Sequence, residues 1–439
     1  MARVDRTVGG HDLVRGGDRM LVKSWLRIVI AAVIALAVFP GAAGASPPPG
    51  RTPVVFFPGY GLTRLEVTVD GQSTAPGCPR SGSFGSWFAN DRPSTEFSQV
   101  CQDRLLTLHY DPDPAKPMPE RFSYPPGVTV RVAGYGRTDS APAYEPLYRA
   151  LEASGYRRDH DIRVAGYDPR LTPDLDGFLE RTRRLVEDTY RENGDRPVHL
   201  AGHSNGPLYA QYLLTHTTRA WRDKYLHGFT PFAGNLPGQG MLYATMFTGL
   251  NIQDFGAPKT AENARSSALM YLSAPSTYMS AADPAVFGDR EVVVQDTSTG
   301  RSYTPRDYPR LFADARLPMA KELADHYTGF VEFTGPRSFP GVDVFAEKGS
   351  GLPTTVGARL AGLTPGQVLD TKALLTRDGD GNQEDITNEA VLAWRSMPCH
   401  RFSLTDNPGV DHFSLPGHRA ALDRLITHLG QPRTTCREP

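Results

Sequence analysis

The chain has 439 residues, of which 39% are hydrophobic and 22% are charged, a composition typical of a globular protein. Its 47 Lys and Arg residues are nearly balanced by 48 Asp and Glu residues. This balance argues against a nucleic-acid-binding protein and against a polybasic membrane patch. Length alone suggests two or three domains, although α/β enzymes often run this long as one domain with insertions.

The N-terminus has the pattern of a secretory signal peptide. Lys23 and Arg27 precede an apolar stretch at 28–39, and small residues follow at 41–45. We therefore expect residues 1–45 to be a signal peptide cleaved near Ala45, and the mature protein to be secreted. The apolar stretch is shorter than the roughly 20 residues of a membrane span, although an uncleaved N-terminal membrane anchor is an alternative. The position of Met20 just before the basic residues suggests that residues 1–19 are a misannotated start.

Strands and helices are expected to alternate along residues 46–439. Short β-branched apolar runs indicate strands, and amphipathic stretches that begin at Pro or end at Gly indicate helices. The alternation predicts an α/β fold with a mostly parallel central sheet and crossover helices. The expected strands are 53–57, 128–132, 162–165, 198–201, 228–233, 342–346 and 402–404, and the expected helices are 173–194, 207–216 and 418–429.

Two segments interrupt this alternation. Residues 66–125 are rich in Pro, Gly and Ser and predict an excursion from the core. Residues 235–335 lose the strand–helix alternation and predict a cap, or lid, inserted above the sheet.

The even number of cysteines in an exported chain favours disulfides over free thiols or a metal site. Three pairings are possible, and the local one needs no long-range coincidence. We expect Cys78–Cys101 and Cys399–Cys436. Because no C-x-x-C motif or His cluster is present, we expect no zinc or other metal.

The sequence Gly202-His203-Ser204-Asn205-Gly206 matches the G-x-S-x-G motif of a nucleophilic serine. An expected strand precedes the motif and an expected helix follows it, the context in which such a serine lies exposed at a sharp turn. The alternative is a serine in an ordinary turn. We predict that Ser204 is the nucleophile and that the fold is that of an α/β-hydrolase.

A serine nucleophile needs a histidine base oriented by a carboxylate, and in this fold they follow in the order Ser, Asp or Glu, His. His412 is the late histidine that lies in the loop between the last strand and the last helix, so it is our predicted base. The carboxylate is expected in the turn at 378–382 or at Asp385. The same stretch partly matches a calcium loop, whose positions 1, 3, 5 and 12 would be Asp378, Asp380, Asn382 and Glu389. Gln383, however, replaces the glycine that such a loop needs.

An oxyanion hole is expected from two backbone N–H groups. The loop after the first expected strand supplies that of Tyr60, and the residue after the nucleophile supplies that of Asn205.

Together these motifs resemble the lecithin:cholesterol acyltransferase family over residues 53 to about 415. The resemblance is carried by the G-x-S-x-G motif, called the nucleophile elbow, and by six further matches. These are Pro58-Gly59 with Leu65-Glu66, Val132 to Thr138, Tyr167 to Leu171, Tyr303-Thr304, Arg306 to Tyr308, and Asp378 to Gly381. It implies a Ser204–Asp380–His412 triad, with Asp385 as the alternative acid. It also implies that the Cys78–Cys101 disulfide closes a membrane-docking excursion, where Phe84, Trp87 and Phe88 could insert into a lipid surface. In place of the hydrophobic residue usual after the nucleophile, this chain has Asn205.

The expected function is that of a secreted serine hydrolase or O-acyltransferase acting on lipid esters through an acyl-enzyme, as a phospholipase or lipid acyltransferase. The expected partners are a lipid ester substrate and a membrane or lipoprotein-like surface, and no cofactor is expected. The alternatives are a triacylglycerol lipase or carboxylesterase on the same fold, and a catalytically silent lipid-binding protein.

Overall fold

The structure is a computed structural model that describes residues 51–73, 75–85, 96–250, 260–334 and 336–435. These residues belong to one compact unit, Gly50–Pro439. The predicted signal peptide lies outside the described residues. No helix among the described residues is long and apolar enough to cross a membrane.

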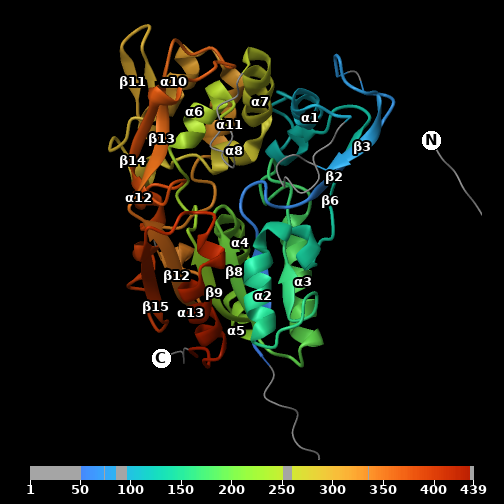
Figure 1. The fold of residues 1–439 in the computed structure, drawn as a ribbon, viewed down its shortest axis with the longest axis vertical. Coiled ribbons are helices and arrows are strands. Elements are labelled where there is room, and N and C mark those ends of the chain that lie inside the picture. Colours follow the sequence, from blue (N-terminus) through green and yellow to red (C-terminus); the bar gives the residue numbers. More distant parts are fainter. Residues whose placement is uncertain (1–50, 74, 86–95, 251–259, 335, 436–439) are drawn as a thin grey trace, which may run out of the picture. The chain divides into compact units, whose positions relative to one another are not determined.

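A six-stranded sheet, in the order β15-β12-β9-β8-β1-β7, forms the centre of this unit (Figure 1). Every neighbouring pair in it is parallel. This finding confirms the predicted α/β-hydrolase class with a mostly parallel sheet. The strands are β1 (Val54–Phe57), β7 (Ile162–Val164), β8 (Val198–His203), β9 (Leu226–Phe232), β12 (Asp343–Ser350) and β15 (Phe402–Pro408).

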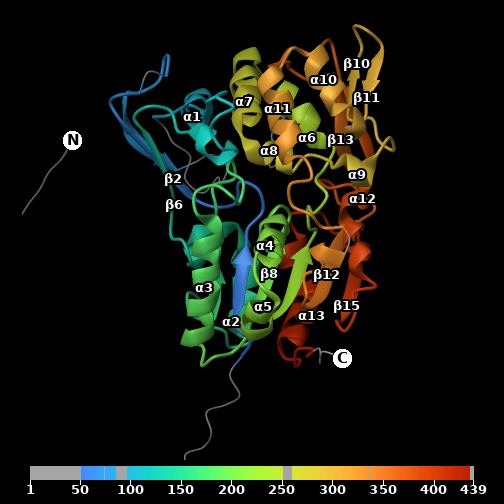
Figure 2. The same ribbon diagram turned by 180° about the vertical axis from the view of Figure 1, so that it is seen from behind.

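Helices cover both faces of the central sheet, which is why its strands read as continuous apolar runs. In β1, Val54 and Phe56 pack into the core below α2 (Glu145–Ala153) and α13 (Arg419–Leu429). Their neighbours Val55 and Phe57 belong to the core of the opposite face. That face is covered by α3 (Phe178–Glu192), α4 (Gly206–Thr215) and α5 (Arg219–Tyr225) (Figure 2).

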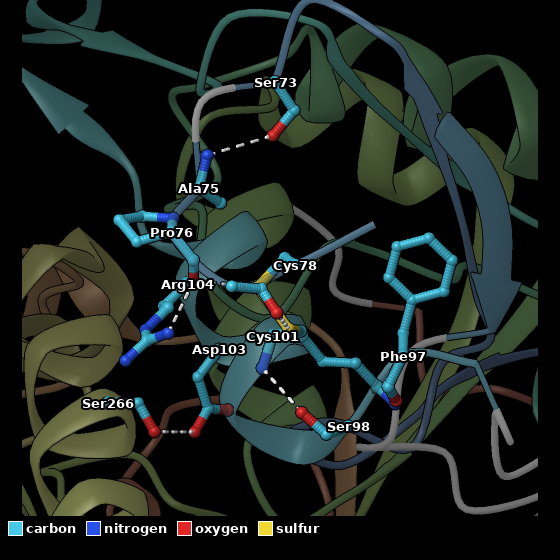
Figure 3. Close-up of a disulfide and its surroundings, with 12 residues drawn as sticks. Ser73, Ala75, Pro76, Cys78, Phe97, Ser98, Cys101, Asp103, Arg104 and Ser266 are labelled. Carbon is cyan, nitrogen blue, oxygen red and sulfur yellow. Dashed lines mark hydrogen bonds between the residues drawn. A yellow bond between two sulfur atoms is a disulfide. The ribbon is translucent and has the colours of Figure 1, made fainter. Parts of the chain in front are cut away.

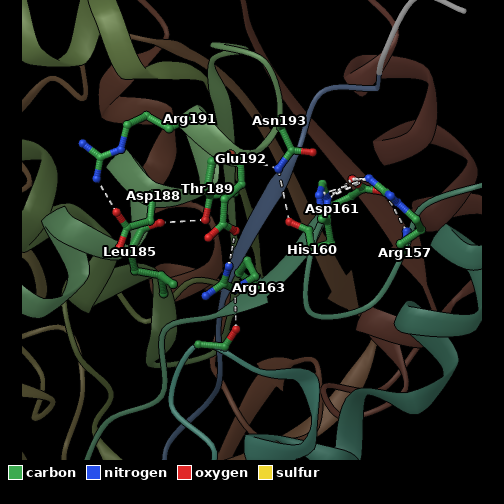
Figure 4. Close-up of polar contacts among 11 residues, drawn as sticks. Arg157, His160, Asp161, Arg163, Leu185, Asp188, Thr189, Arg191, Glu192 and Asn193 are labelled. Carbon is green, nitrogen blue, oxygen red and sulfur yellow. Dashed lines mark hydrogen bonds and ion pairs between the residues drawn. The ribbon is translucent and has the colours of Figure 1, made fainter. Parts of the chain in front are cut away.

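Polar contacts fix α3 against the strand β7 (Figure 4). Arg163 of β7 donates to the Glu192 carboxylate at 2.8 Å and to the Gly136 carbonyl at 2.7 Å. The Asn193 side chain, at the end of α3, donates to the His160 carbonyl at 3.2 Å. The bonds to Glu192 and Asn193 hold the C-terminal end of α3 against β7 and the residues before it.

The predicted start of α3 at residue 173 is wrong. The helix begins at Phe178 because Asp176 and Gly177 take left-handed backbone conformations, with φ of 53° and 62°. Residues with positive φ cannot continue an α-helix.

The predicted strand at 128–132 is present as β6, but it does not join the central sheet. It pairs with β2 in a separate three-stranded antiparallel sheet, β3-β2-β6. Leu65, Val67 and Val69 of β2 are buried and alternate with exposed Glu66, Thr68 and Asp70. The excursion elements are β2 (Leu65–Asp70), β3 (Ser81–Gly85), α1 (Gln99–Leu106), β4 (His109–Tyr110), β5 (Phe122–Ser123) and β6 (Val128–Val132).

The predicted Cys78–Cys101 disulfide is present and joins the segment before β3 to the first turn of α1, within the excursion (Figure 3). In the same helix, the buried carboxylate of Asp103 accepts hydrogen bonds from Ser266 and Ser267 of α7 at 2.9 and 2.6 Å. The excursion is thereby bonded to the helical segment that follows β9. The second predicted pair includes Cys436, which lies outside the described residues.

The predicted cap is built from helices together with strands that extend past residue 335. A four-stranded sheet, β11-β10-β13-β14, combines strands from residues 294–303 with the hairpin at 352–379. The cap-side elements are α6 (Met241–Thr248), α7 (Ala261–Ser273), α8 (Pro275–Met279), α9 (Pro284–Phe287), β10 (Val294–Asp296), β11 (Arg301–Tyr303), α10 (Tyr308–Asp314), α11 (Pro318–Tyr327), β13 (Leu352–Leu360), β14 (Leu374–Gly379) and α12 (Asp385–Asn388).

Removing the disulfide by the double substitution Cys78→Ser and Cys101→Ser should lower the free energy of unfolding by roughly 2–4 kcal/mol, since the bond closes a loop in the unfolded chain. The loop spans a sequence separation of 23 residues. Denaturant titration of the purified variant and the parent protein measures the difference. Equal midpoints and slopes would contradict the expectation.

Candidate active site

The loops that follow β1 and β8 meet at the carboxyl edge of the central sheet, where ligands of parallel α/β folds bind. Gly59 follows β1, and Ser204 follows β8. A Cβ atom placed on Gly59 would lie 3.1 Å from the Cβ atom of Ser204. The first loop therefore passes directly against the predicted nucleophile.

Ser204 lies in a strained turn between β8 and α4. Its φ is 58°, a left-handed conformation that is uncommon for a residue with a side chain. Two main-chain hydrogen bonds hold it, from its own N–H to the Phe232 carbonyl at 3.0 Å and from the Asn235 N–H to its carbonyl at 2.8 Å. A Cβ atom on Gly206 would lie 2.1 Å from the Phe57 carbonyl oxygen, so only glycine permits this approach of α4 to β1.

Asp380 and His412 form a buried hydrogen-bonded pair. The Nδ1 atom of His412 lies 2.9 Å from Oδ2 of Asp380, and the backbone N–H of His412 donates to the Asp380 carbonyl at 2.9 Å. The exposed fractions of the two residues are 0% and 1%. Asp380 thus holds both the ring and the main chain of His412.

The Asp380 carboxylate accepts further hydrogen bonds besides the one from His412. It accepts from the backbone N–H groups of Asn382 and Gln383 at 3.0 and 2.7 Å and from the Asn388 amide at 3.2 Å. Burial would raise the pKa of Asp380, but the interaction with His412 and these N–H donors hold the pKa below its ordinary value. The carboxylate is therefore ionised at neutral pH.

An ionised Asp380 fixes the tautomer of His412. Because the carboxylate accepts, Nδ1 of His412 carries the proton, which leaves Nε2 as the basic atom. Nε2 is buried and has no hydrogen-bond partner among the described residues, so no bond joins it to the Ser204 hydroxyl in this structure. The ring of His203, adjacent to Ser204, lies 4.6 Å from the His412 ring between centroids.

The alternative acid, Asp385, lies elsewhere. It begins α12, and its carboxylate accepts a hydrogen bond from Lys348 at 3.3 Å. The same lysine donates to Glu389 at 2.7 Å. The structure brings Asp380, and not Asp385, to His412.

These partners also differ from those of a calcium loop, because Asp380 and Glu389 bond to His412 and Lys348 rather than converging on one point. Within the described ranges, no group of three or more His, Cys, Asp or Glu side chains could hold a metal ion.

The two predicted oxyanion residues lie in the two loops that meet at Ser204. Tyr60 follows Gly59, and its buried ring stacks on Tyr271 at 6.3 Å. Asn205 precedes the first turn of α4, and its side-chain oxygen accepts from Asn235 at 3.1 Å and from Ser280 at 2.8 Å. Because Ser280 ends the cap helix α8, the residue after the nucleophile is bonded to the cap.

The predicted lipid-surface residue Phe84 is buried, with an exposed fraction of 6%. It pairs across β2 and β3 with Val67, and its ring packs on Phe97 at 4.7 Å. Alternation along β3 turns this side chain toward the core of the excursion, so it does not reach a lipid surface in this structure. Trp87 and Phe88 lie outside the described residues.

Three buried residues near the site were not predicted from the sequence: Tyr144, His203 and Glu384. His203 lies inside the G-x-S-x-G motif, where any residue is permitted, and Tyr144 lies in a stretch with no motif. Their contacts are tertiary, so no local signal marks them.

Glu384 is a buried carboxyl group close to the acid of the pair. It accepts from the Gly240 N–H at 2.8 Å and is 1% exposed. Burial, with a further contribution from the Glu291 carboxylate, raises the pKa of Glu384 to about 8. Glu384 is therefore mostly protonated at neutral pH, which keeps a second negative charge away from Asp380.

A parallel sheet whose carboxyl edge carries a strained serine beside a hydrogen-bonded Asp–His pair defines an α/β-hydrolase. A chain of the Tle4–Tli4 complex has the same fold, with a TM-score of 0.51 and 13% sequence identity over 86% of this chain and 98% of that chain.

A sequence profile described as lecithin:cholesterol acyltransferase matches residues 117–329. The lysosomal phospholipase A and acyltransferase of Mus musculus is 30% identical over 326 residues, which cover 70% of this chain and 74% of that protein. The lecithin-cholesterol acyltransferase-like 1 protein of Oryza sativa subsp. japonica is 29% identical over 82% of both chains. The phosphatidylcholine-sterol acyltransferase of Gallus gallus is 27% identical over 66% of this chain and 70% of that protein.

The chain therefore belongs to the lecithin:cholesterol acyltransferase family, which confirms the resemblance found in its motifs. Membership places the protein among the ester hydrolases and acyltransferases.

Substituting each candidate acid separately distinguishes their roles. Asp380→Asn should lower kcat by about 10³-fold or more, because the amide no longer fixes the tautomer of His412 or stabilises its cation. Asp385→Asn is the matched control and should stay within about threefold of the parent, since it loses only one partner of Lys348. Steady-state hydrolysis of a soluble ester measures both, and a loss confined to Asp385→Asn would contradict the assignment.

Glu384→Gln should change how stability depends on pH. In the unfolded chain the carboxyl group loses its proton near 4.5, whereas in the folded protein it keeps the proton to about pH 8. The folded state thus binds more protons between these values, and the parent should lose stability relative to the variant, by roughly 2–4 kcal/mol, as the pH rises from 5 to 8. Denaturant titrations at several pH values measure the difference, and parallel curves would contradict it.

Proposed function

We propose that the protein is a serine hydrolase and O-acyltransferase that acts on lipid esters through Ser204, His412 and Asp380. The observation that carries this proposal is the buried 2.9 Å contact between His412 and Asp380 beside a serine at φ 58°. Family membership supports it independently.

The proposed reaction has two steps. The Ser204 hydroxyl attacks the ester carbonyl while Nε2 of His412 takes its proton, and the proton then passes to the departing alcohol as the acyl-enzyme forms. Water or an acceptor alcohol next attacks the acyl group and gives its proton to His412. His412 then returns the proton to the departing Ser204 oxygen as the acid or a new ester is released. Throughout, the Asp380 carboxylate stabilises the imidazolium form of His412.

The backbone N–H groups of Tyr60 and Asn205 are the proposed donors to the negatively charged oxygen of the tetrahedral intermediate. Asn205 directly follows Ser204, and Tyr60 follows Gly59, which lies against Ser204, so both positions support this role. The N-terminus of α4 adds a favourable potential at the same point.

A phospholipid is the proposed acyl donor, because relatives are named phospholipase A and phosphatidylcholine-sterol acyltransferase. The disulfide-closed excursion, bonded to α7 through Asp103, is the proposed contact with a membrane or lipoprotein-like surface. Trp87 and Phe88 are its proposed lipid-inserting side chains.

Export is proposed from the basic and apolar pattern at residues 23–45. The name of the Mus musculus relative, a lysosomal enzyme, is consistent with passage through the secretory route. N-terminal sequencing of the secreted protein would locate the cleavage site.

A fluorophosphonate probe and a lipid panel test the proposed function. The parent protein should be labelled, and Ser204→Ala should not be labelled and should lose about 10³-fold or more in kcat with little change in stability. Product analysis by mass spectrometry after incubation with phospholipid and sterol vesicles should reveal free fatty acid, a transferred acyl ester, or both.

The outcomes separate the alternatives. A parent protein that resists the probe and forms no product would overturn the enzymatic proposal and favour a lipid-binding protein. Labelling with hydrolysis of triacylglycerol or simple esters, but not of phospholipid, would instead favour a lipase or carboxylesterase.

A further inference from the structure

A chain of three buried hydrogen bonds joins the loop beside Ser204 to the backbone of His412. The Gly59 N–H donates to the Tyr144 hydroxyl at 2.7 Å. This hydroxyl lies 2.9 Å from Nδ1 of His203, and Nε2 of His203 lies 2.9 Å from the His412 carbonyl oxygen. Tyr144, His203 and His412 have exposed fractions of 3%, 1% and 1%.

The proton on each atom follows from chemistry. A carbonyl oxygen only accepts, so Nε2 of His203 carries a hydrogen. In the neutral ring Nδ1 is then an acceptor, and the Tyr144 hydroxyl donates to it. The same hydroxyl accepts from the Gly59 N–H, so each of the three donors meets one acceptor.

The charge state of His203 agrees with this assignment. Burial, and to a lesser degree the neighbouring His412, hold the pKa of His203 well below its ordinary value. A protonated ring would turn a second donor toward Tyr144, whose own hydrogen would lose its acceptor. At neutral pH the His203 ring is therefore neutral, and all three hydrogen bonds are kept.

We infer that Tyr144 and His203 are positioning residues that fix His412 relative to Ser204 and the oxyanion loop, an inference that rests on the proposed function. The series of hydrogen bonds begins at Gly59, which lies against Ser204 and precedes Tyr60. It ends on the main chain of His412, whose N–H is held by Asp380 at 2.9 Å. The base is thereby held at its carbonyl by His203 and at its N–H and ring by Asp380.

In this role neither Tyr144 nor His203 contacts the reacting atoms. Their effect comes through the placement of His412 and of the loop carrying Tyr60. A small displacement of a catalytic group is enough to reduce turnover by about 100-fold. This role gives a physical reason for histidine within the elbow, since an imidazole can accept on one side and donate on the other.

The test compares Tyr144→Phe with Tyr148→Phe. Tyr148 lies four residues later on α2, is also buried, and donates its hydroxyl hydrogen to the Ala141 carbonyl at 3.0 Å, outside the chain. Each substitution removes one buried hydroxyl and retains the ring. Measurements are kcat and KM for a soluble p-nitrophenyl ester, the rate of fluorophosphonate labelling, and the unfolding midpoint.

Tyr144→Phe should lower kcat and the labelling rate about 10- to 100-fold with KM nearly unchanged, whereas Tyr148→Phe should stay within about threefold of the parent. His203→Gln, which keeps a donor and an acceptor, should retain more activity than His203→Phe. Both substitutions break the same series of hydrogen bonds. The double variant with Tyr144→Phe and His203→Phe should therefore lose little more activity than the less active of the two single variants.

A measurement on the parent protein does not depend on variants that fold. ¹⁵N-histidine NMR should show His203 as the neutral Nε2–H tautomer between pH 5 and pH 8. A protonated ring or an Nδ1–H tautomer would overturn the inference.

The inference and the proposed function fail in different ways. A labelled parent with equal losses for Tyr144→Phe and Tyr148→Phe, or with multiplying losses in the double variant, overturns the inference alone. A parent that the probe does not label overturns the proposed function and, with it, the inference.

Discussion

The backbone turn at Ser204 is the constraint on which the arrangement of the site depends. A side chain at φ 58° is unfavourable by itself, so the surrounding structure must hold it. The Phe232 carbonyl of β9 accepts from the Ser204 N–H, and the Asn235 N–H donates to the Ser204 carbonyl. Because β8 lies between β1 and β9, both neighbouring strands contribute: β9 supplies the hydrogen bond, and β1 supplies the surface against which Gly206 packs.

The ionisation states of the groups around this turn also favour the proposed site. Asp380 is a buried anion whose charge is compensated by backbone and amide N–H donors as well as by His412. Other titratable groups near it are kept neutral, with the pKa of His203 lowered and the pKa of Glu384 raised, in both cases first by burial. A single negative charge in a weakly polarisable interior acts strongly on the neighbouring imidazole, and a competing charge would weaken that effect.

The sequence predicted the parts of this arrangement that have local causes. The strand β8, the turn and α4 are contiguous, so the apolar run, the motif glycines and the following helix identify them together. Local reasoning leaves the choice between Asp380 and Asp385 open because both lie in one short stretch of the sequence. The family resemblance is what favours Asp380. The reason for that preference is tertiary: Asp380 follows β14, in a hairpin that projects from β12, and only the folded hairpin turns Asp380 toward His412 and Asp385 toward Lys348.

The misplaced elements have equally physical explanations. The strict alternation of Leu65, Val67 and Val69 with polar residues marks a half-buried strand, but the composition of the segment concealed it. That strand pairs with 128–132 and takes β6 out of the central sheet. Burial of Phe84 follows from the same pairing, since alternate residues of β3 face the core of the excursion. Sequence periodicity indicates that a strand exists, but not which sheet it joins.

The excursion and the site are mechanically connected through a buried ion pair. Arg170 is fully buried and bonds to the Asp168 carboxylate, and it also donates to the Leu106 carbonyl at the end of α1 at 2.6 Å. A buried pair of charges is stable only when further hydrogen bonds satisfy the remaining donors and acceptors.

The further bonds to these two charges come from the excursion, and the main chain of the same segment is bonded to the cap. Tyr124, between the excursion strands, donates to Asp168 at 3.3 Å, and Ser276 of α8 donates its backbone N–H to the Arg170 carbonyl at 3.3 Å. Separating the excursion from this segment would therefore remove the Leu106 bond from the Arg170 guanidinium and the Tyr124 bond from the Asp168 carboxylate. It follows that the excursion and α8, which carries the Ser280 contact to Asn205, are held in fixed register with the strained serine.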